Sequence, residues 1–210
     1  MRTDVGAITA PLIAHYEFEG NAGAGVPDSS GNGHDGACVS GCPGDTGGKF
    51  GAAYNFNGSS NVISVPDASS LRPSAITVTI WVNLRSSANQ GIVQKVYGAA
   101  NLNSWQLMIN SMGALEACAG AICTGPTLSV SLNAWHHLAY VGTGARLELY
   151  LDGVLLAGSP SSHAYDAGDI TIGADRDNGV EVGFVDGYLD DVRIYAGALD
   201  AASIAALAAE

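Results

Sequence analysis

The chain has 210 residues, of which 47% are hydrophobic and 13% charged, and its twenty acidic and eight basic residues give a net charge of −12. This length suffices for one large β domain, and the composition excludes a disordered chain. The negative charge disfavours nucleic acid and anionic membranes as partners, because both need a basic footprint. It is compatible with divalent cations and neutral sugars. No apolar run reaches transmembrane length, so we expect no membrane insertion.

Residues 1–10 carry Arg2 and Asp4 and lack the apolar centre of a signal peptide. We interpret them as an N-terminal extension or a cloning remnant, and residues 11–210 as one domain. The expected molecule is a monomeric module cut from a longer exported protein.

The first predicted strand, residues 12–18, alternates apolar and polar side chains. A long loop follows over residues 19–36, rich in Gly, Ser, Asn and Asp, which predicts bends with exposed carbonyls. Residues 31–36 match the GxGxxG pattern of dinucleotide sites. No helix follows them, so this match is interpreted as a false positive.

The four cysteines form two local pairs, Cys38 with Cys42 and Cys118 with Cys123. Zinc is the first alternative, but zinc knuckles prefer tighter spacing and no nearby histidine completes a ligand set. Two short-loop disulfides are the preferred interpretation. Disulfides persist in oxidising compartments, so the protein is expected to be secreted, extracellular or periplasmic.

Short strands with turn signals between them recur along the rest of the chain. We expect them at residues 52–56, 62–65, 75–83, 91–96, 105–109, 114–118, 135–141, 147–151, 154–157, 170–173 and 187–195. Only the C-terminus predicts a helix, capped by Asp200, with Ile204 and Leu207 on its buried side. The predicted fold is all-β, an antiparallel two-sheet jelly-roll sandwich with a short C-terminal helix.

The last predicted strand, residues 187–195, contains two adjacent acids in an apolar context. With a period of two, Leu189 and Asp191 share one face while Asp190 and Val192 share the other. One interpretation leaves both acids in water at the strand end. The other places Asp190 at the sheet rim as a ligand of calcium.

Several motifs together resemble a known family. Residues 16–21 (YEFEGN) and 28–33 (DSSGNG) resemble the opening of the laminin-G-like jelly rolls in the concanavalin A-like lectin/glucanase superfamily. Further segments resemble its later strands in the same order: AYNFNG at 53–58, ITVTIWV at 76–82, WHHLA at 135–139, LYLDG at 149–153 and GYLDDVRIY at 187–195. Together they cover roughly residues 11–208.

The resemblance implies a jelly roll with a structural calcium where the first loop meets the last strand. The ligands carried over by motif are the carboxylates of Asp28 and Asp190, with Asn32 and nearby carbonyls, and Glu19 as a weaker candidate. Calcium prefers six to eight oxygen ligands, which such a loop offers. The alternative is that Asp28 only caps its own turn as an Asx residue.

A catalytic function requires a pair of carboxylates. The acidic strand pattern of the superfamily's glucanases is absent, and only Glu17 and Glu19 have a spacing that puts two acids on one strand face. Because the expected metal loop follows them directly, catalysis by this pair is the weaker interpretation.

Sugar binding requires an exposed aromatic platform flanked by planar polar groups. Trp105 lies near Tyr97 and Asn101 in a polar stretch, and Trp81 faces away from the Ile/Val side of its strand. The alternative is that both tryptophans fill the edge of the sandwich. Arg176 and Asn178 are candidates to complete a site on a hairpin tip.

These observations predict a non-catalytic, calcium-stabilised, lectin-like carbohydrate-binding or adhesion module whose partner is a polysaccharide or surface glycan. Two alternatives stay open. One is a polysaccharide hydrolase or lyase on the same fold, and the other is a protein-interaction or spacer domain.

Overall fold

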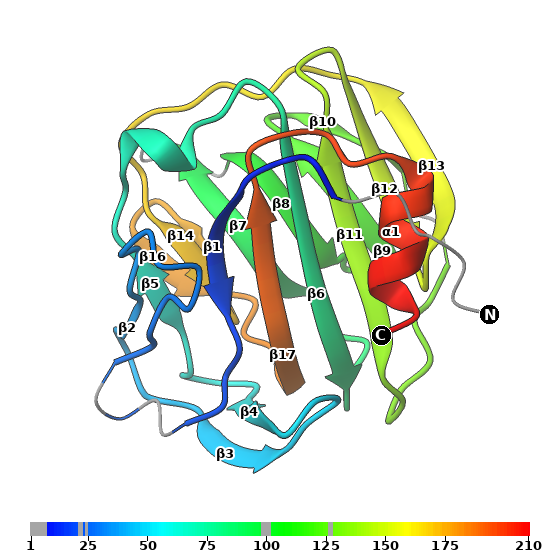
Figure 1. The fold of residues 1–210 in the computed structure, drawn as a ribbon. Coiled ribbons are helices and arrows are strands. Elements are labelled where there is room, and N and C mark those ends of the chain that lie inside the picture. The colour runs from blue at the N-terminus through cyan, green and yellow to red at the C-terminus, as the bar shows by residue number, and fades with distance from the viewer. Residues whose placement is uncertain (1–7, 21–22, 24, 98–101, 126–127) are drawn as a thin grey trace, which may run out of the picture.

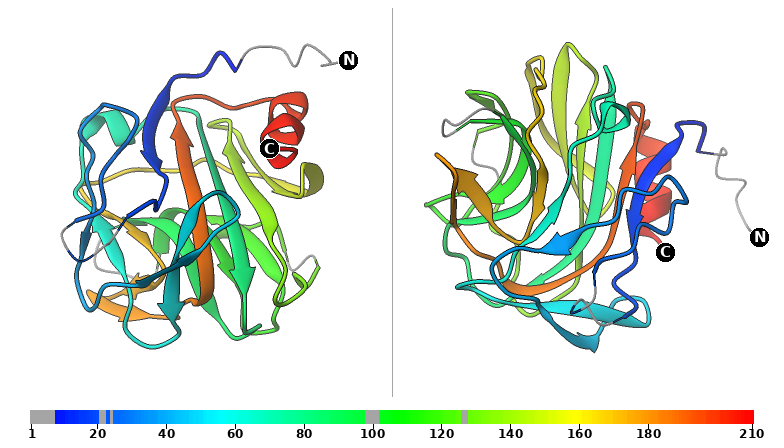
Figure 2. Two further views of the ribbon diagram at one scale, coloured as in Figure 1. Left: turned by 60° about the horizontal axis from the view of Figure 1, so that its bottom comes forward. Right: turned by 90° about the vertical axis from the view of Figure 1, so that its left-hand side faces the viewer.

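The computed structural model describes residues 8–20, 23, 25–97, 102–125 and 128–210. Two antiparallel sheets face each other, and one short helix lies against the outside of the larger sheet (Figure 1). The predicted all-β jelly-roll sandwich is therefore confirmed. Figure 2 shows the two layers from the side, with the helix on the outer face of the larger sheet.

The larger sheet has eight strands in the order β13-β12-β11-β6-β17-β4-β3, with β1 also paired to β17. Its strands are β1 (Leu12–Tyr16), β3 (Gly44–Gly47), β4 (Ala52–Asn57), β6 (Ile76–Leu84), β11 (His136–Gly142), β12 (Arg146–Leu151), β13 (Val154–Pro160) and β17 (Asp186–Tyr195).

The second sheet has seven strands in the order β10-β9-β8-β7-β14-β5-β2. They are β2 (Ala37–Cys38), β5 (Ile63–Val65), β7 (Gln90–Tyr97), β8 (Leu102–Ile109), β9 (Leu115–Ala119), β10 (Ile122–Cys123) and β14 (Ile170–Ile172). A separate hairpin joins β15 (Asp175–Asp177) to β16 (Val180–Val182), and a 3-10 turn spans Ser69–Leu71.

The main core lies between the two sheets and is built by alternation along the strands. On β6 the side chains of Ile76, Val78, Ile80 and Val82 are fully buried in it, as the sequence pattern predicts. Burying each such side chain contributes about 1.5–3 kcal/mol. The opposite side chains of β6, including Trp81, therefore belong to the outer face of the eight-stranded sheet.

Helix α1 (Ala201–Ala208) covers part of that outer face. The Asp200 carboxylate caps it by accepting a hydrogen bond from the Ser203 N–H at 2.8 Å. Ile204 and Leu207 are buried in a second cluster against Tyr150 and Tyr195, so the predicted helix and its buried side are confirmed.

Both cysteine pairs are disulfides, as predicted: Cys38 bonds to Cys42, and Cys118 to Cys123. Within the described ranges, no helix has the length and the apolar composition that crossing a bilayer requires.

Candidate metal centre

One edge of strand β17, which contains the two adjacent acids, pairs first with β4 and then with β1. Residues 186–189 pair with β4, and residues 192–195 pair with β1. Between these two stretches, the register against β6 advances by three residues on β17 for two on β6, from Asp190 opposite Trp81 to Arg193 opposite Thr79. This is a β-bulge, with Asp191 in a left-handed conformation at φ 51°.

The bulge changes which side chains face outward. Leu189, Val192 and Ile194 all belong to the main core, so the two residues between Leu189 and Val192 are displaced together to the outer face. The predicted strict alternation, with Asp190 beside Val192, is therefore wrong. A bulge inserts one extra residue, and here it brings both acids to the same side of the sheet.

Both acids line a pocket of about 180 Å³, which we call the acidic pocket. It is lined by His15, Glu17, Glu19, Phe50, Asp190, Asp191, Arg193 and Glu210. Ligand sites for organic molecules typically enclose about 300–1,000 Å³. The acidic pocket is therefore small for a sugar chain, while its volume suits an ion with a few waters.

Asp190 is the most unusual carboxylate of the pocket. Its side chain is fully buried, Oδ2 accepts a hydrogen bond from the Phe50 N–H at 3.0 Å, and Oδ1 has no hydrogen-bond partner in the described structure. Burial above all, together with the nearby negative charges of Asp191 and Glu19, raises the pKa of Asp190 to about 6. An unpartnered buried carboxylate oxygen is costly and is a natural place for a cation.

Glu19 and Asp190 both accept hydrogen bonds from the backbone of residues 48–52. Its Oε2 accepts a hydrogen bond from the Ala52 N–H at 3.0 Å. A Cβ on Gly51 would come within 2.3 Å of the Glu19 carboxylate oxygens, and one on Gly48 within 2.6 Å of Asp190 Oδ2. The two glycines thus allow the turn at residues 48–52 to approach both carboxylates closely.

Asp191 is already neutralised by protein side chains. One oxygen lies 2.7 Å from His15 Nε2, and the other lies 2.9 Å from the Arg193 guanidinium, which also contacts Glu210 at 2.8 Å. Arg193 therefore links Glu210, at the C-terminal end, to Asp191 in the bulge. Asp191 has little capacity left for a metal ion.

Asp28 has a different environment. Its Oδ1 accepts hydrogen bonds from the N–H groups of His15 and Ser30, both at 2.9 Å, and its Oδ2 accepts one from His34 at 3.0 Å. Burial alone would raise the pKa of Asp28, but the hydrogen bonds from Ser30, His34 and His15 outweigh it and hold the pKa below its ordinary value. The bond to Ser30 forms the Asx turn that the sequence offered as the alternative to a metal ligand.

Asn32 does not line the acidic pocket either. It is exposed, and its Nδ2 donates to the backbone oxygens of Leu12 at 3.1 Å and Ile13 at 3.3 Å. Of the four predicted ligands, the structure brings Asp190 and Glu19 together in the pocket, and places Asp28 and Asn32 beside the outer edge of β1.

The acidic pocket offers carboxylate oxygens, although among the described residues no three of its acids have ligand atoms within 4.8 Å of one another. Asp190 Oδ1 has no hydrogen-bond partner, and Glu19 Oε2 accepts a hydrogen bond from the Ala52 N–H. Glu17 is exposed and lines the same pocket. These are hard oxygen donors, which Ca²⁺ prefers over softer ligands. The sequence pattern indicated Glu17 only as a catalytic acid, because its proximity to Asp190 depends on the pairing of β1 with β17.

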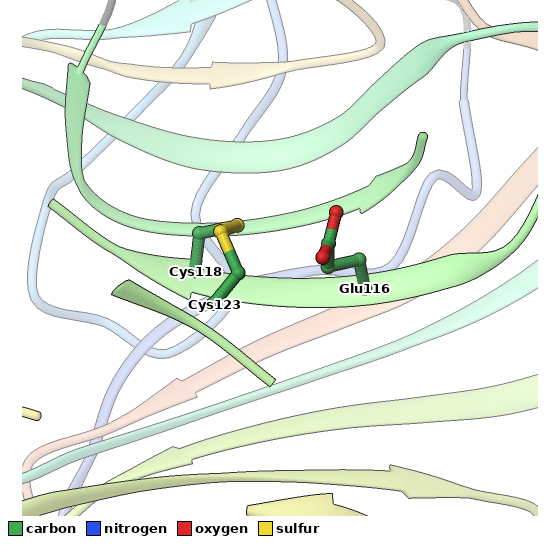
Figure 3. Close-up of side chains that lie close together, drawn as sticks. All are labelled: Glu116, Cys118 and Cys123. Atoms are coloured by element: carbon green, nitrogen blue, oxygen red, sulfur yellow. A yellow bond between two sulfur atoms is a disulfide. The ribbon is translucent and has the colours of Figure 1, made fainter. Parts of the chain in front are cut away.

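Three residues of the described ranges have possible ligand atoms within 4.8 Å of one another, but they do not form a metal site. Glu116, Cys118 and Cys123 lie close together on β9 and β10 (Figure 3). Both sulfur atoms belong to one disulfide, so neither is a thiolate that can bind a metal.

The predicted aromatic platform is wrong at both tryptophans. Trp105 is fully buried and belongs to the main core, because β8 turns this face inward. Trp81 does lie on an outer face but is only 5% exposed. The Lys49 Nζ lies 3.9 Å from its ring centroid, and His137 packs edge-on at 5.3 Å.

The remaining predicted ligand residues lie near the β15–β16 hairpin or outside the described ranges. Arg176 and Asn178 line one open pocket of about 300 Å³, and the Arg176 guanidinium bonds to Glu181 at 3.0 Å. Tyr97 is 38% exposed at the end of β7. Asn101 lies outside the described residues.

A sequence model described as the concanavalin A-like lectin/glucanases superfamily (Laminin_G_3) matches residues 57–205. The chain belongs to this superfamily. A search of the curated proteins finds no match to the sequence.

Several solved structures share this fold at low sequence identity. Domain 4 of AbnA, an extracellular GH43 arabinanase from Geobacillus stearothermophilus solved with arabinotriose, has a TM-score of 0.72 at 20% identity, covering 95% of this chain and 98% of that one. Trypanosoma rangeli sialidase with the inhibitor DANA gives 0.75 at 17%, covering 95% of this chain and 33% of that one. The binding domain of Paraclostridial Mosquitocidal Protein 1 gives 0.71 at 17%, covering 94% and 52%.

Proposed function

We propose that this chain is a non-catalytic carbohydrate-binding module of a larger exported protein, stabilised by calcium in the acidic pocket. The observation that carries the proposal is the combination of a small pocket with an unpartnered, fully buried Asp190 Oδ1. A bound cation would satisfy this oxygen, whereas the pocket offers little room for a sugar chain. The function of the module then depends on another surface.

A structural calcium would hold together segments that are distant in the sequence. Glu19 follows β1, and Asp190 lies on the last strand, while both contact the turn that precedes β4. An ion bound only by the folded state stabilises it by RT ln(1 + [Ca²⁺]/Kd). Calcium at such a place would therefore stabilise the edge where β17 changes partner from β4 to β1.

Carbohydrate binding is supported by the fold and by its neighbours. The AbnA domain is similar in extent to this chain and was solved with arabinotriose, and the superfamily includes lectins. The two disulfides support an extracellular or periplasmic location. A glycan array tests this proposal: retention of one glycan class in calcium supports it, and no retention on a broad array contradicts it.

One observation favours the enzymatic alternative. A carboxyl group with a pKa of about 6, next to other acids, has the property of a general acid. Under this alternative, a polysaccharide would be cleaved by the wild type and not by Asp190→Asn. Release of new reducing ends from any substrate of a broad polysaccharide panel, lost in that variant, would replace the non-catalytic proposal.

A further inference from the structure

A row of polar and aromatic side chains crosses four strands at one end of the outer face. Tyr188 on β17 pairs with Asn83 on β6 and with Asn55 on β4, and Trp135 directly precedes His136, which pairs with Val82 of β6. We call Trp135, Asn83, Tyr188 and Asn55 the outer-face platform. In Figure 1, α1 lies in front of this sheet near β11 and β12, and the lower ends of β6, β11 and β17 extend below it.

The two aromatic rings of the platform are tilted against each other on either side of β6. The centroids of Trp135 and Tyr188 are 6.5 Å apart with an interplanar angle of 42°, and both residues are partly exposed. Asn83 lies between their strands, and its Oδ1 is buried without a partner in the described structure. A ligand hydroxyl group that reached this acceptor would supply the missing hydrogen bond.

Two cations flank the platform in different ways. The Arg85 guanidinium lies 4.8 Å from the Tyr188 ring centroid and is neutralised by Asp186 at 2.8 Å. Lys49 lies over Trp81, which is two residues before Asn83 on β6. Among the lysines and arginines of the described ranges, Lys49 alone makes no ion pair.

We propose that the outer-face platform binds an acidic oligosaccharide, with a sugar ring against Trp135 and Tyr188 and its carboxylate or sulfate beside Lys49. Aromatic faces pack against the C–H face of a sugar while planar amides bond its hydroxyl groups. Asn83 supplies such an amide, and Asn55 supplies its Nδ2 donor, since its Oδ1 accepts a hydrogen bond from Arg85 at 2.8 Å. The net charge of −12 acts at long range, where salt screens it beyond about 8 Å. At contact distance the unpaired ammonium group favours an anion.

This inference rests on the proposed glycan-binding function and locates it. The test is an array of uronic, sialic and sulfated oligosaccharides beside neutral ones, probed in calcium with the whole chain. We expect the wild type to retain an acidic glycan. Trp135→Leu, which keeps apolar bulk but removes the aromatic face, should weaken its binding about tenfold, while Trp135→Phe should largely retain it.

Charge and fluorescence supply independent readouts. Lys49→Gln should remove the preference for acidic over neutral glycans, whereas the control Arg146→Gln, at an exposed position distant in the sheet order, should not. Trp135 is the partly exposed tryptophan of the three, since Trp81 and Trp105 are at most 5% exposed. The retained glycan should therefore protect the wild type from acrylamide quenching and have no such effect on Trp135→Leu.

Three results would overturn the inference in distinguishable ways. Unchanged binding by folded Trp135→Leu, with loss in Asn178→Ala, would move the site to the β15–β16 hairpin and leave the proposed function intact. Retention of neutral glycans alone, insensitive to Lys49→Gln, would contradict the acidic ligand. No retention of any glycan by the wild type would reject both the platform and the proposed function.

Discussion

Asp28 and Asp190 are both buried acids near β1, but they differ in how far backbone hydrogen bonds compensate for the burial of the carboxylate. Asp28 receives three backbone N–H bonds, and its pKa is lowered. Asp190 receives backbone hydrogen bonds from Phe50 and Lys49, but one of its oxygens has no partner, and burial above all raises its pKa to about 6. We therefore expect a cation at Asp190, where one carboxylate oxygen lacks a partner, rather than at Asp28, whose oxygens accept three backbone N–H bonds.

The largest effect is expected at the satisfied carboxylate. Asp28→Ala removes the acceptor of three N–H groups, and hydrogen bonds to a charged group contribute about 1.5–3 kcal/mol each without being additive. We expect the free energy of unfolding to fall by about 2–4 kcal/mol, measured by urea denaturation. Asp28→Asn is the control that keeps the shape and should lose less. A fall below about 0.5 kcal/mol in Asp28→Ala would show that the turn does not depend on these bonds.

Asp190→Asn should have the opposite sign when calcium is absent. With chelator present, the amide removes a buried, unpaired charge, so the free energy of unfolding should stay constant or rise by roughly 1 kcal/mol. In calcium at about 100 times Kd, the wild type should gain about 2.7 kcal/mol that the variant lacks. Equal losses in Asp28→Asn and Asp190→Asn with chelator would remove the contrast between the two acids.

The two acids should also give opposite pH dependences. Between pH 3.8 and about 6, the unfolded chain releases the Asp190 proton while the folded chain retains it, so in chelator the contribution of Asp190 to stability decreases as pH rises. The lowered pKa of Asp28 contributes stability above pH 3.8, which is lost as pH falls through its folded value. Unfolding of wild type and Asp190→Asn across pH 3–7 measures the difference. Identical profiles would contradict the raised pKa of Asp190.

Asn32→Ala should have the smallest effect. Its bonds to the Leu12 and Ile13 oxygens are exposed, so we expect a change within about 1 kcal/mol and an unaltered response to calcium. Thermal unfolding with and without calcium measures both. Loss of the calcium response in this variant would restore Asn32 as a ligand.

Local patterns predicted most of the fold. Alternation along β6, the Asp200 cap of α1 and both local cysteine pairs are visible in the sequence, because each depends on residues a few positions apart. The bulge in β17 was not predictable in this way. It arises because β4 and β1 share one edge of the strand, which depends on pairing across most of the chain.

The candidate site was predictable only in part. The motif suggested Asp190 and Glu19, which line one pocket, but it does not reveal that three backbone N–H groups bond to Asp28, or that Glu17 lines the same pocket. Aromatic residues were misjudged for a similar reason. Trp105 has polar neighbours in the sequence, yet it is buried because its face of β8 points into the core. Trp135 lies near Tyr188 because β11 and β17 both pair with β6.

Calcium titration followed by native mass spectrometry tests the central claim most directly, on wild type, Asp190→Asn and Asn32→Ala. The account predicts one chelator-sensitive calcium ion in the wild type and in Asn32→Ala, and none in Asp190→Asn at the same free calcium. A wild type without bound calcium, or Asp190→Asn that retains it, would contradict the account.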